Sequence, residues 1–195
     1  MKIERPKSNQ PIPDHAKKVF EGVLFDVYQW PQEMYDGTTQ TFERLKRADV
    51  VVVFGVLPDG KILMADQEQP GRDPYVGAIA GRMEKGEEVI DAAKREFREE
   101  TGYEADKYIL IDAKQTASKI DWVVYTFIAK GLRKVGEQEL DGGEKIKLRS
   151  VTFDELLEMA DKSFFPNKEL ALMLLAAKSD SAKMTELRKL FDPKL

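Results

Sequence analysis

The sequence contains no cysteine and only one histidine, His15, among its 195 residues. Without cysteine the chain has no disulfides, no thiolate metal ligands and no cysteine nucleophile. A lone histidine in a proline-rich leader also argues against a Ser-His-Asp triad and against a zinc site built from several histidines. Any catalysis by this chain must therefore rely mainly on carboxylates.

Excess positive charge and long apolar runs are absent as well. The formal net charge is −4 and the sequence pI is about 5.3, which argues against a general nucleic-acid-binding surface. No stretch reaches the roughly 18 apolar residues of a membrane helix, and the leader MKIERPKSNQPIPDH contains no apolar signal segment. We therefore expect a soluble cytoplasmic protein that binds neither membrane nor nucleic acid.

Apolar residues that alternate or run continuously predict strands, and helical spacing predicts helices. The predicted strands are 19–30, 38–46, 49–57, 61–69, 76–80, 108–113, 122–129 and 145–153. The predicted helices are 87–102, 154–162, 167–178 and 181–191. Residues 1–17 are expected to form a loose arm, the first two strands a hairpin, and residues 70–74 (PGRDP) a loop. This order of elements predicts an α+β fold with a mixed central sheet and an extra N-terminal β-hairpin.

The predicted helix 87–102 has an acidic side. Each residue advances about 100° around an α-helix, which brings Glu96, Glu99 and Glu100 to one side, next to an apolar stripe that docks on the sheet. Glutamates at these spacings repel by about 0.2–0.5 kcal/mol per pair. Such a cluster, next to a glycine-bearing loop, suits a hard divalent cation such as Mg²⁺. A solvated charged face is the alternative, and on physical grounds alone both interpretations remain open.

Residues 81–103 read GRMEKGEEVIDAAKREFREETGY and fill every fixed position of the pattern GX5EX7REUXEEXGU, in which U is a bulky apolar residue. The matching residues are Gly81, Glu87, Arg95, Glu96, Phe97, Glu99, Glu100, Gly102 and Tyr103. With average residue usage, such a match arises by chance in this length at about 10⁻⁶ or below. The segment resembles the signature of the Nudix hydrolases, and this resemblance favours the metal site over the solvated face.

The resemblance implies a fold, a metal site and a reaction. Nudix enzymes fold as α/β/α sandwiches in which the signature forms a loop, a helix and a loop. Arg95 would orient a glutamate, with Glu87 as its partner. The implied reaction is attack by water on a phosphorus of a diphosphate bridge, assisted by Mg²⁺, with Mn²⁺ as the alternative. The implied metal ligands are the backbone carbonyl of Ala80 and the side chains of Glu96, Glu99 and Glu100.

Outside the signature, most of residues 19–178 resembles the branch of ADP-ribose and nucleoside-diphosphate-sugar pyrophosphatases. In that branch an extra N-terminal sheet is commonly shared between two subunits, so the resemblance implies a homodimer. The implied layout is an arm and hairpin over 1–47, a Nudix domain over 48–180, and a C-terminal helix and tail over 181–195.

The same branch implies functional residues beyond the signature. A further catalytic carboxylate usually follows it in a loop, where Glu144 fits best and Glu139 and Asp141 are the other candidates. A plain solvated acidic loop is the alternative for each of them. Tyr28 and Trp30 are candidates for an aromatic platform under a base, with ordinary packing as the alternative.

The expected substrate is a small nucleotide derivative, a nucleoside diphosphate linked to a sugar or a similar group. Two departures weaken the case for ADP-ribose itself. No proline or glycine lies between Gly102 and Gly131, where ADP-ribose hydrolases carry a Ser-Pro-Gly-like turn, and residues 67–76 differ from the usual arginine-containing stretch. Arg72 is still a candidate phosphate contact. The alternatives are a pyrophosphohydrolase that removes modified nucleoside triphosphates and a non-catalytic module that senses a nucleotide.

Overall fold

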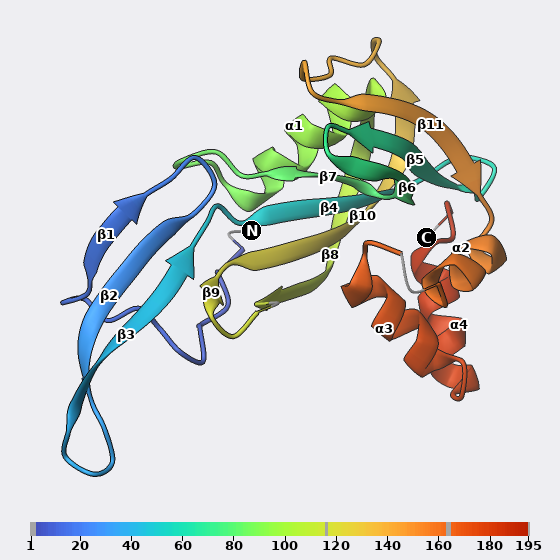
Figure 1. The fold of residues 1–195 in the computed structure, drawn as a ribbon. Coiled ribbons are helices and arrows are strands. Elements are labelled where there is room, and N and C mark those ends of the chain that lie inside the picture. Colours follow the sequence, from blue (N-terminus) through green and yellow to red (C-terminus); the bar gives the residue numbers. More distant parts are fainter. Residues whose placement is uncertain (1–2, 116, 163–164, 195) are drawn as a thin grey trace.

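The computed structural model describes residues 3–115, 117–162 and 165–194, which form two β-sheets and the helices that cover the larger one (Figure 1). The strands are β1 (Lys17–Glu21), β2 (Asp26–Glu33), β3 (Thr39–Lys46), β4 (Val50–Val56), β5 (Ile62–Gln69), β6 (Arg72–Gly77), β7 (Ile79–Arg82), β8 (Tyr103–Gln115), β9 (Ile120–Asp121), β10 (Val123–Lys134) and β11 (Lys145–Val151). The helices are α1 (Val89–Thr101), α2 (Phe153–Ala160), α3 (Lys168–Ala177) and α4 (Ser181–Leu190). None of these helices is long and apolar enough to cross a membrane.

The central sheet has the strand order β11-β5-β4-β10-β8, with β6 beside β5 and β7 beside β4. It is mixed, because β4 and β10 run parallel whereas its other pairs are antiparallel. Side chains of β4 alternate between two hydrophobic clusters: Val51 and Val53 pack with α1, and Val52 and Phe54 pack with α2, α3 and α4. Helix α1 therefore covers one face and the C-terminal helices cover the other, which confirms the α/β/α sandwich.

Helix α1 packs directly against the sheet. Phe97 is fully buried, and a Cβ on Gly55 of β4 would lie 2.7 Å from its ring, so glycine is required at this contact. The helix ends at Gly102, whose φ of 70° lies in the left-handed region that glycine adopts without strain. The predicted helix is thus present, although it begins at Val89 rather than Glu87.

The N-terminal sheet differs from the predicted hairpin. Residues 19–30, predicted as one strand, contain parts of both β1 and β2, which pair antiparallel. The turn between them is closed by the Gly22 amide, which donates to the Phe25 carbonyl at 3.0 Å. With β3 and the short β9 the sheet has the order β1-β2-β3-β9, and it projects away from the sandwich (Figure 1). The predicted hairpin is present as β2 and β3, which pair antiparallel. The predicted extent of its first strand was wrong, since a glycine turn separates β1 from β2.

Residues 70–74, predicted as a loop, also differ. Residues from Arg72 onward form β6, which pairs with β5 across a turn at Gly71 with φ of 76°. The first residues of β6 are exposed and polar, so their sequence lacks the alternation that identifies a strand.

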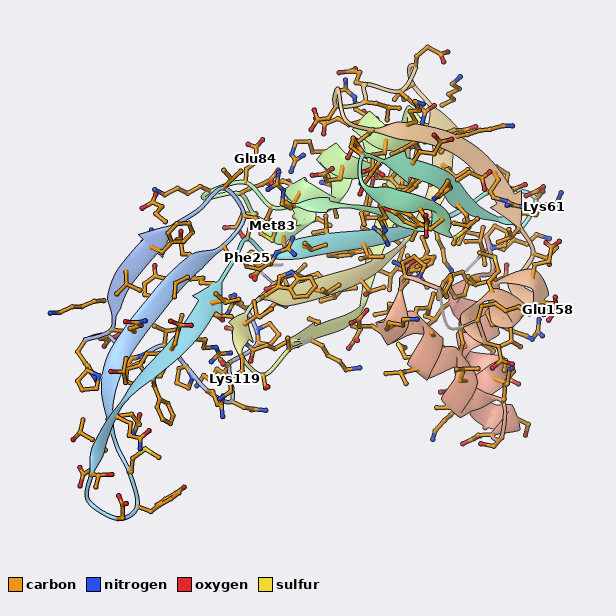
Figure 2. All side chains as sticks on the ribbon, viewed as in Figure 1. Phe25, Lys61, Met83, Glu84, Lys119 and Glu158 are labelled. Carbon is orange, nitrogen blue, oxygen red and sulfur yellow. The ribbon has the colours of Figure 1, made fainter. Side chains whose placement is uncertain are left out.

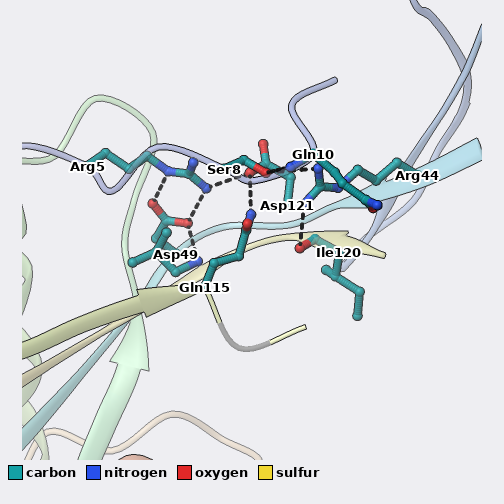
Figure 3. A network of polar contacts seen from close by, with 9 residues as sticks. Arg5, Ser8, Gln10, Arg44, Asp49, Gln115, Ile120 and Asp121 are labelled. Atoms are coloured by element: carbon teal, nitrogen blue, oxygen red, sulfur yellow. Dashed lines mark hydrogen bonds and ion pairs between the residues drawn. The ribbon is translucent and has the colours of Figure 1, made fainter. Parts of the chain in front are cut away.

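The N-terminal arm is hydrogen-bonded to the sandwich by a polar network (Figure 3). Arg5 donates to both oxygens of Asp49, at 2.7 and 3.0 Å, and to Asp121 at 3.0 Å. Asp49 also accepts from the backbone amide of Val123 at 2.9 Å. The expected loose arm is instead held against the starts of β4 and β10, which limits how the N-terminal sheet is oriented toward the sandwich.

Candidate active site

The Glu96 carboxylate lies directly against Gly81. A Cβ on Gly81 would come within 1.8 Å of the Glu96 Cδ, so any other residue would displace the carboxylate. This contact gives a physical reason for the glycine that begins the signature. The Glu96 side chain is only 14% exposed. Burial raises the pKa of Glu96, and the bond from Arg95 opposes the rise.

Arg95 connects the acidic residues of the signature. Its Nε and Nη2 donate to the two oxygens of Glu87 at 2.8 and 3.0 Å. This bidentate contact joins Arg95 to the glutamate that the resemblance names as its partner. Its Nη1 donates to Glu96 at 2.8 Å and to Glu99 at 3.1 Å, and its Nη2 reaches the Arg82 carbonyl at 3.0 Å. The bond from Arg95 lowers the pKa of Glu87, and the same bond raises the pKa of Arg95. Both side chains are therefore charged at neutral pH.

Glu100 is the carboxylate that most requires a partner. It is 5% exposed, and its Oε2 is buried without a hydrogen-bond partner among the described residues. Burial, followed by the charges of Glu144 and Glu96, raises the pKa of Glu100 to about 8, against an opposing effect of the Ala80 backbone. A buried oxygen without a donor is unfavourable. A divalent cation would compensate it.

The loop between β10 and β11 is fixed across the end of α1. The Gln138 side chain donates to the backbone carbonyls of Glu100 at 2.6 Å and Ile146 at 3.2 Å. The backbone amide of Glu139 donates to the Glu99 carbonyl at 2.8 Å. These contacts bring the acidic end of the loop beside the signature helix.

Glu144 and Glu139, two of the three post-signature candidates, lie differently in this loop. Burial raises the pKa of Glu144, and the charges of Asp141 and Glu99 add to the rise. Glu139 accepts from Arg98 at 2.7 Å, where both side chains are largely exposed. Both glutamates line the same cleft. The charge of Glu144 acts on Glu100 by raising its pKa, whereas Glu139 is already paired with Arg98.

The site is an open cleft next to a second hollow. The cleft, of about 690 Å³, lies between α1, β7 and the β10–β11 loop, and we call it the acidic cleft. Its carboxylates belong to Glu84, Glu96, Glu99, Glu100, Glu139, Asp141 and Glu144. A neighbouring hollow of about 610 Å³, which we call the basic pocket, is lined by three arginines and by Trp122. The two share Arg47, Gln69, Ala80, Gly81 and Arg82.

The predicted substrate residues lie in three different places. Arg72 lines the basic pocket, with its guanidinium 3.6 Å from the Tyr75 ring centroid. Tyr28 lines a third hollow, of about 720 Å³, between the N-terminal sheet and the signature loop. Trp30 lines none of these hollows: it is 9% exposed and packs edge-on against Phe42, with 6.0 Å between ring centroids. Substrate contact by Tyr28 and Trp30 remains a prediction.

The sequence analysis did not single out three further residues at the site, Arg47, Arg82 and Trp122. Arg47 follows β3 and Arg82 ends β7, and the antiparallel pairing of β4 with β7 sets Arg82 opposite Val50. The guanidinium of Arg47 lies 4.6 Å from the Trp122 ring centroid. Arg82 directly follows the signature glycine, which is a usable signal, whereas Arg47 and Trp122 approach each other only through the fold.

The donor atoms of the acidic cleft fit a hard divalent cation. Within the ranges that the structure describes, no three acidic side chains already stand as a coordinating group. Glu96 and Glu99 instead both accept from Arg95. The available donors are carboxylates beside the exposed Ala80, and the buried Glu100 oxygen lacks a partner. Oxygen donors of this kind are those that Mg²⁺ and Mn²⁺ bind.

Comparison with known proteins agrees with this geometry. The model of the NUDIX domain matches residues 46–172, so this chain belongs to the Nudix family and is a Nudix hydrolase. It is 34% identical over 148 residues to an ADP-ribose pyrophosphatase of Bacillus subtilis (strain 168), which covers 74% of this chain and 80% of that protein. It is 30% identical over 157 residues to a methanol dehydrogenase activator of Bacillus methanolicus, which covers 78% of this chain and 85% of that protein.

A solved structure described as an ADP compounds hydrolase has the same fold. Its TM-score is 0.67 at 20% sequence identity, and the match covers 89% of this chain and 97% of that one. At this identity the likeness concerns the fold alone. It confirms the predicted α+β fold of Nudix type.

Proposed function

We propose that this Nudix hydrolase is a Mg²⁺-dependent diphosphatase. Its substrate is a nucleoside diphosphate linked to another group, of the ADP-ribose or nucleotide-sugar type, and its products are a nucleoside monophosphate and a phosphorylated moiety. The observation that carries the proposal is the partnerless Glu100 oxygen within a cleft of signature carboxylates. Mg²⁺ is usually held by protein carboxylates together with substrate phosphates, so a diphosphate suits the cation that such a cleft would hold.

Mg²⁺, with Mn²⁺ as the alternative, would be held by Glu96, Glu99, Glu100 and the backbone carbonyl of Ala80. When bound, the metal supplies Lewis acidity, which neutralises phosphate charge and makes water a better nucleophile. Glu99 and Glu100 are the catalytic carboxylates closest to this chemistry. Arg95 would then hold Glu87 in place and release the other carboxylates to the metal.

Glu144 is the proposed general base. Its pKa is raised by burial, which moves it toward the neutral range where a carboxylate accepts a proton most effectively. In this role Glu144 takes the proton of the water that attacks phosphorus. Glu139 is the alternative base, if its bond to Arg98 opens when substrate binds.

ADP-ribose is the first compound to test, because a relative with 34% identity is an ADP-ribose pyrophosphatase. Nucleotide sugars are equally important, since the region between Gly102 and Gly131 lacks the Ser-Pro-Gly-like turn. Arg72 is the proposed phosphate contact in the basic pocket. Tyr28 and Trp30 are proposed contacts for the nucleoside, which they would reach in the active site of a second subunit.

We further propose a homodimer that shares the N-terminal sheet. Apolar side chains are exposed along β1 and its following turn: Val19 is 51% exposed, Phe20 59% and Val23 101%. Exposed apolar groups on a thin sheet are typical of an interaction surface. Sedimentation should give the mass of two chains of 22.2 kDa each, and a monomer at micromolar concentration would contradict the proposal. The cysteine-free composition suits the cytoplasm as the compartment.

The proposed reaction is tested by Mg²⁺-dependent phosphate release coupled to a phosphatase. The panel contains ADP-ribose, nucleotide sugars, dinucleoside polyphosphates and nucleoside triphosphates. We expect turnover of at least one diphosphate-linked compound, lost with a chelator and unchanged in the exposed control Glu104→Gln. Preference for triphosphates would support the pool-cleaning alternative. Tight binding without turnover of any compound would identify a nucleotide-sensing module instead.

A further inference from the structure

Arg47 and Arg82 stand where three hollows meet. Both line the acidic cleft, the basic pocket and the hollow between the N-terminal sheet and the signature loop. This point is the junction of the N-terminal sheet with the sandwich, where Figure 2 shows Phe25 and Met83. Any substrate that extends from the acidic cleft in either direction passes these two arginines.

Neither arginine side chain is compensated within the described chain. No carboxylate forms an ion pair with Arg47 or Arg82 in the described ranges, and the Arg47 Nε is buried without a hydrogen-bond partner. Burial lowers the pKa of Arg47, and the charge of Arg82 lowers it further. The positive charges of Arg47 and Arg82 therefore repel each other, and the Arg47 Nε donor has no acceptor. This arrangement is unfavourable unless an anion binds beside the two arginines.

Aromatic contacts hold Arg47 in position. Its guanidinium carbon lies 5.7 Å from the Phe25 ring centroid and 4.6 Å from that of Trp122. Phe25 lies in the turn between strands β1 and β2 of the N-terminal sheet, and Trp122 immediately precedes β10. Cation–π contacts use the face of a guanidinium and leave its N–H edge available for a planar or tetrahedral anion. The stack thus orients Arg47 without consuming its donors.

The other cation of the acidic cleft is already committed. The arginines that line this cleft are Arg47, Arg82 and Arg95, and Arg95 donates to Glu87, Glu96 and Glu99. Arg47 and Arg82 are therefore the arginines of this cleft that remain available to attract a substrate anion, which the carboxylates alone would repel.

We propose that Arg47 and Arg82 together bind one phosphate of the substrate's diphosphate, opposite the carboxylates of the acidic cleft. The inference rests on the proposed function, since it names the residues that hold the group to be cleaved. The phosphate compensates both charges and offers acceptors to the terminal N–H groups of the two guanidinium groups. Because Phe25 helps to orient Arg47, the N-terminal sheet contributes to phosphate binding within its own chain.

Inorganic pyrophosphate is the probe, titrated by calorimetry with Mg²⁺ and again with a chelator. The variants are Arg47→Gln, Arg82→Gln and Arg47→Lys. The matched control is Arg133→Gln, which removes an arginine that pairs with Glu104 and Asp106 away from all three hollows. We expect affinity to fall about ten- to hundredfold in both glutamine variants, as for loss of a charged hydrogen bond, and to stay unchanged in the control. Arg47→Lys should restore only part of it, because lysine cannot supply the planar fork.

Arg82→Gln separates binding from folding, since the exposed Arg82 stacks on no ring among the described residues and its loss leaves the Arg47 stack intact. With the best substrate of the panel, KM should rise about ten- to hundredfold in both glutamine variants, and more at low ionic strength. Wild-type KM and wild-type pyrophosphate affinity in both variants would overturn the inference while the proposed function stands. Loss of pyrophosphate binding in an enzyme that hydrolyses no panel compound would refute the proposed function and leave the anion site standing.

Discussion

Replacing Glu100 by glutamine should remove activity and yet stabilise the metal-free protein above neutral pH. Burial holds the pKa of Glu100 at about 8, compared with an ordinary value of 4.5. Between pH 4.5 and about 8, the Glu100 carboxyl is ionised in the unfolded chain. On folding it must therefore either take up a proton or be buried with its charge. In this window the folded state binds more protons than the unfolded state, so the free energy of unfolding falls with rising pH. The destabilisation is absent below the pKa of Glu100 in the unfolded chain and complete above its pKa in the folded protein.

The size of the effect follows from that interval. The full difference between the folded and unfolded pKa of Glu100 corresponds to a loss of at most about 5 kcal/mol in the free energy of unfolding, at 1.4 kcal/mol for each pH unit. Because the acidic cleft is open to water and its carboxylates repel one another in both variants, we expect roughly half, about 2–3 kcal/mol. For a chain of this length that amounts to about 5–10 °C in Tm. Any stability cost of burying the glutamine amide does not depend on pH. It therefore cancels when the stability difference between variant and wild type is compared at two pH values.

The assay is thermal unfolding of wild type and Glu100→Gln in a chelator at pH 5 and at pH 8.5. The Tm difference between variant and wild type should shift in favour of the variant by about 5–10 °C between the two pH values. Added Mg²⁺ should raise the Tm of wild type at the higher pH and leave the variant nearly unchanged. A Tm difference that does not vary with pH would refute the buried, partnerless state of Glu100.

Three other perturbations test the surrounding contacts. Gly81→Ala should abolish turnover without unfolding the protein, because its Cβ would come within 1.8 Å of the Glu96 Cδ; activity and circular dichroism together check this. Gln138→Ala removes both side-chain bonds that fix the β10–β11 loop, so kcat should fall about tenfold or more as the base loses its position, with hydrogen exchange increasing in that loop. Arg5→Ala should lower stability by about 1 kcal/mol, after allowance for its 39% exposure, measured by urea unfolding. Unchanged stability would mean that the arm network is not maintained in solution.

The signature helix could be predicted in detail because local rules determine it. Its apolar stripe, its acidic side and its terminal glycine are all present in consecutive residues, and the resemblance supplies the roles. The buried strand β4 was predictable for the same reason, since a continuous apolar run has few other uses. The bidentate bond from Arg95 to Glu87 joins residues eight apart, within reach of a loop and one helix.

Features that depend on distant segments were not predictable. Arg47 meets Trp122 only because β4 and β10 run parallel and side by side, a pairing that no local pattern encodes. The split of residues 19–30 into two strands depends on a turn at Gly22, whose neighbours continue to alternate. The contacts of Trp30 within this chain, where its indole packs against Phe42 and donates to Gln32, were not predictable either; its contact with a nucleoside stays a prediction.

The central claim is that the carboxylates of α1 hold the catalytic metal, and Mn²⁺ titration tests it most directly. Free Mn²⁺ is followed by electron paramagnetic resonance in wild type, Glu100→Gln and the exposed control Glu104→Gln. We predict saturable binding in wild type and in the control, and binding at least about tenfold weaker in Glu100→Gln, as expected when a charged ligand is lost. Equal Mn²⁺ affinity in wild type and Glu100→Gln would contradict the claim.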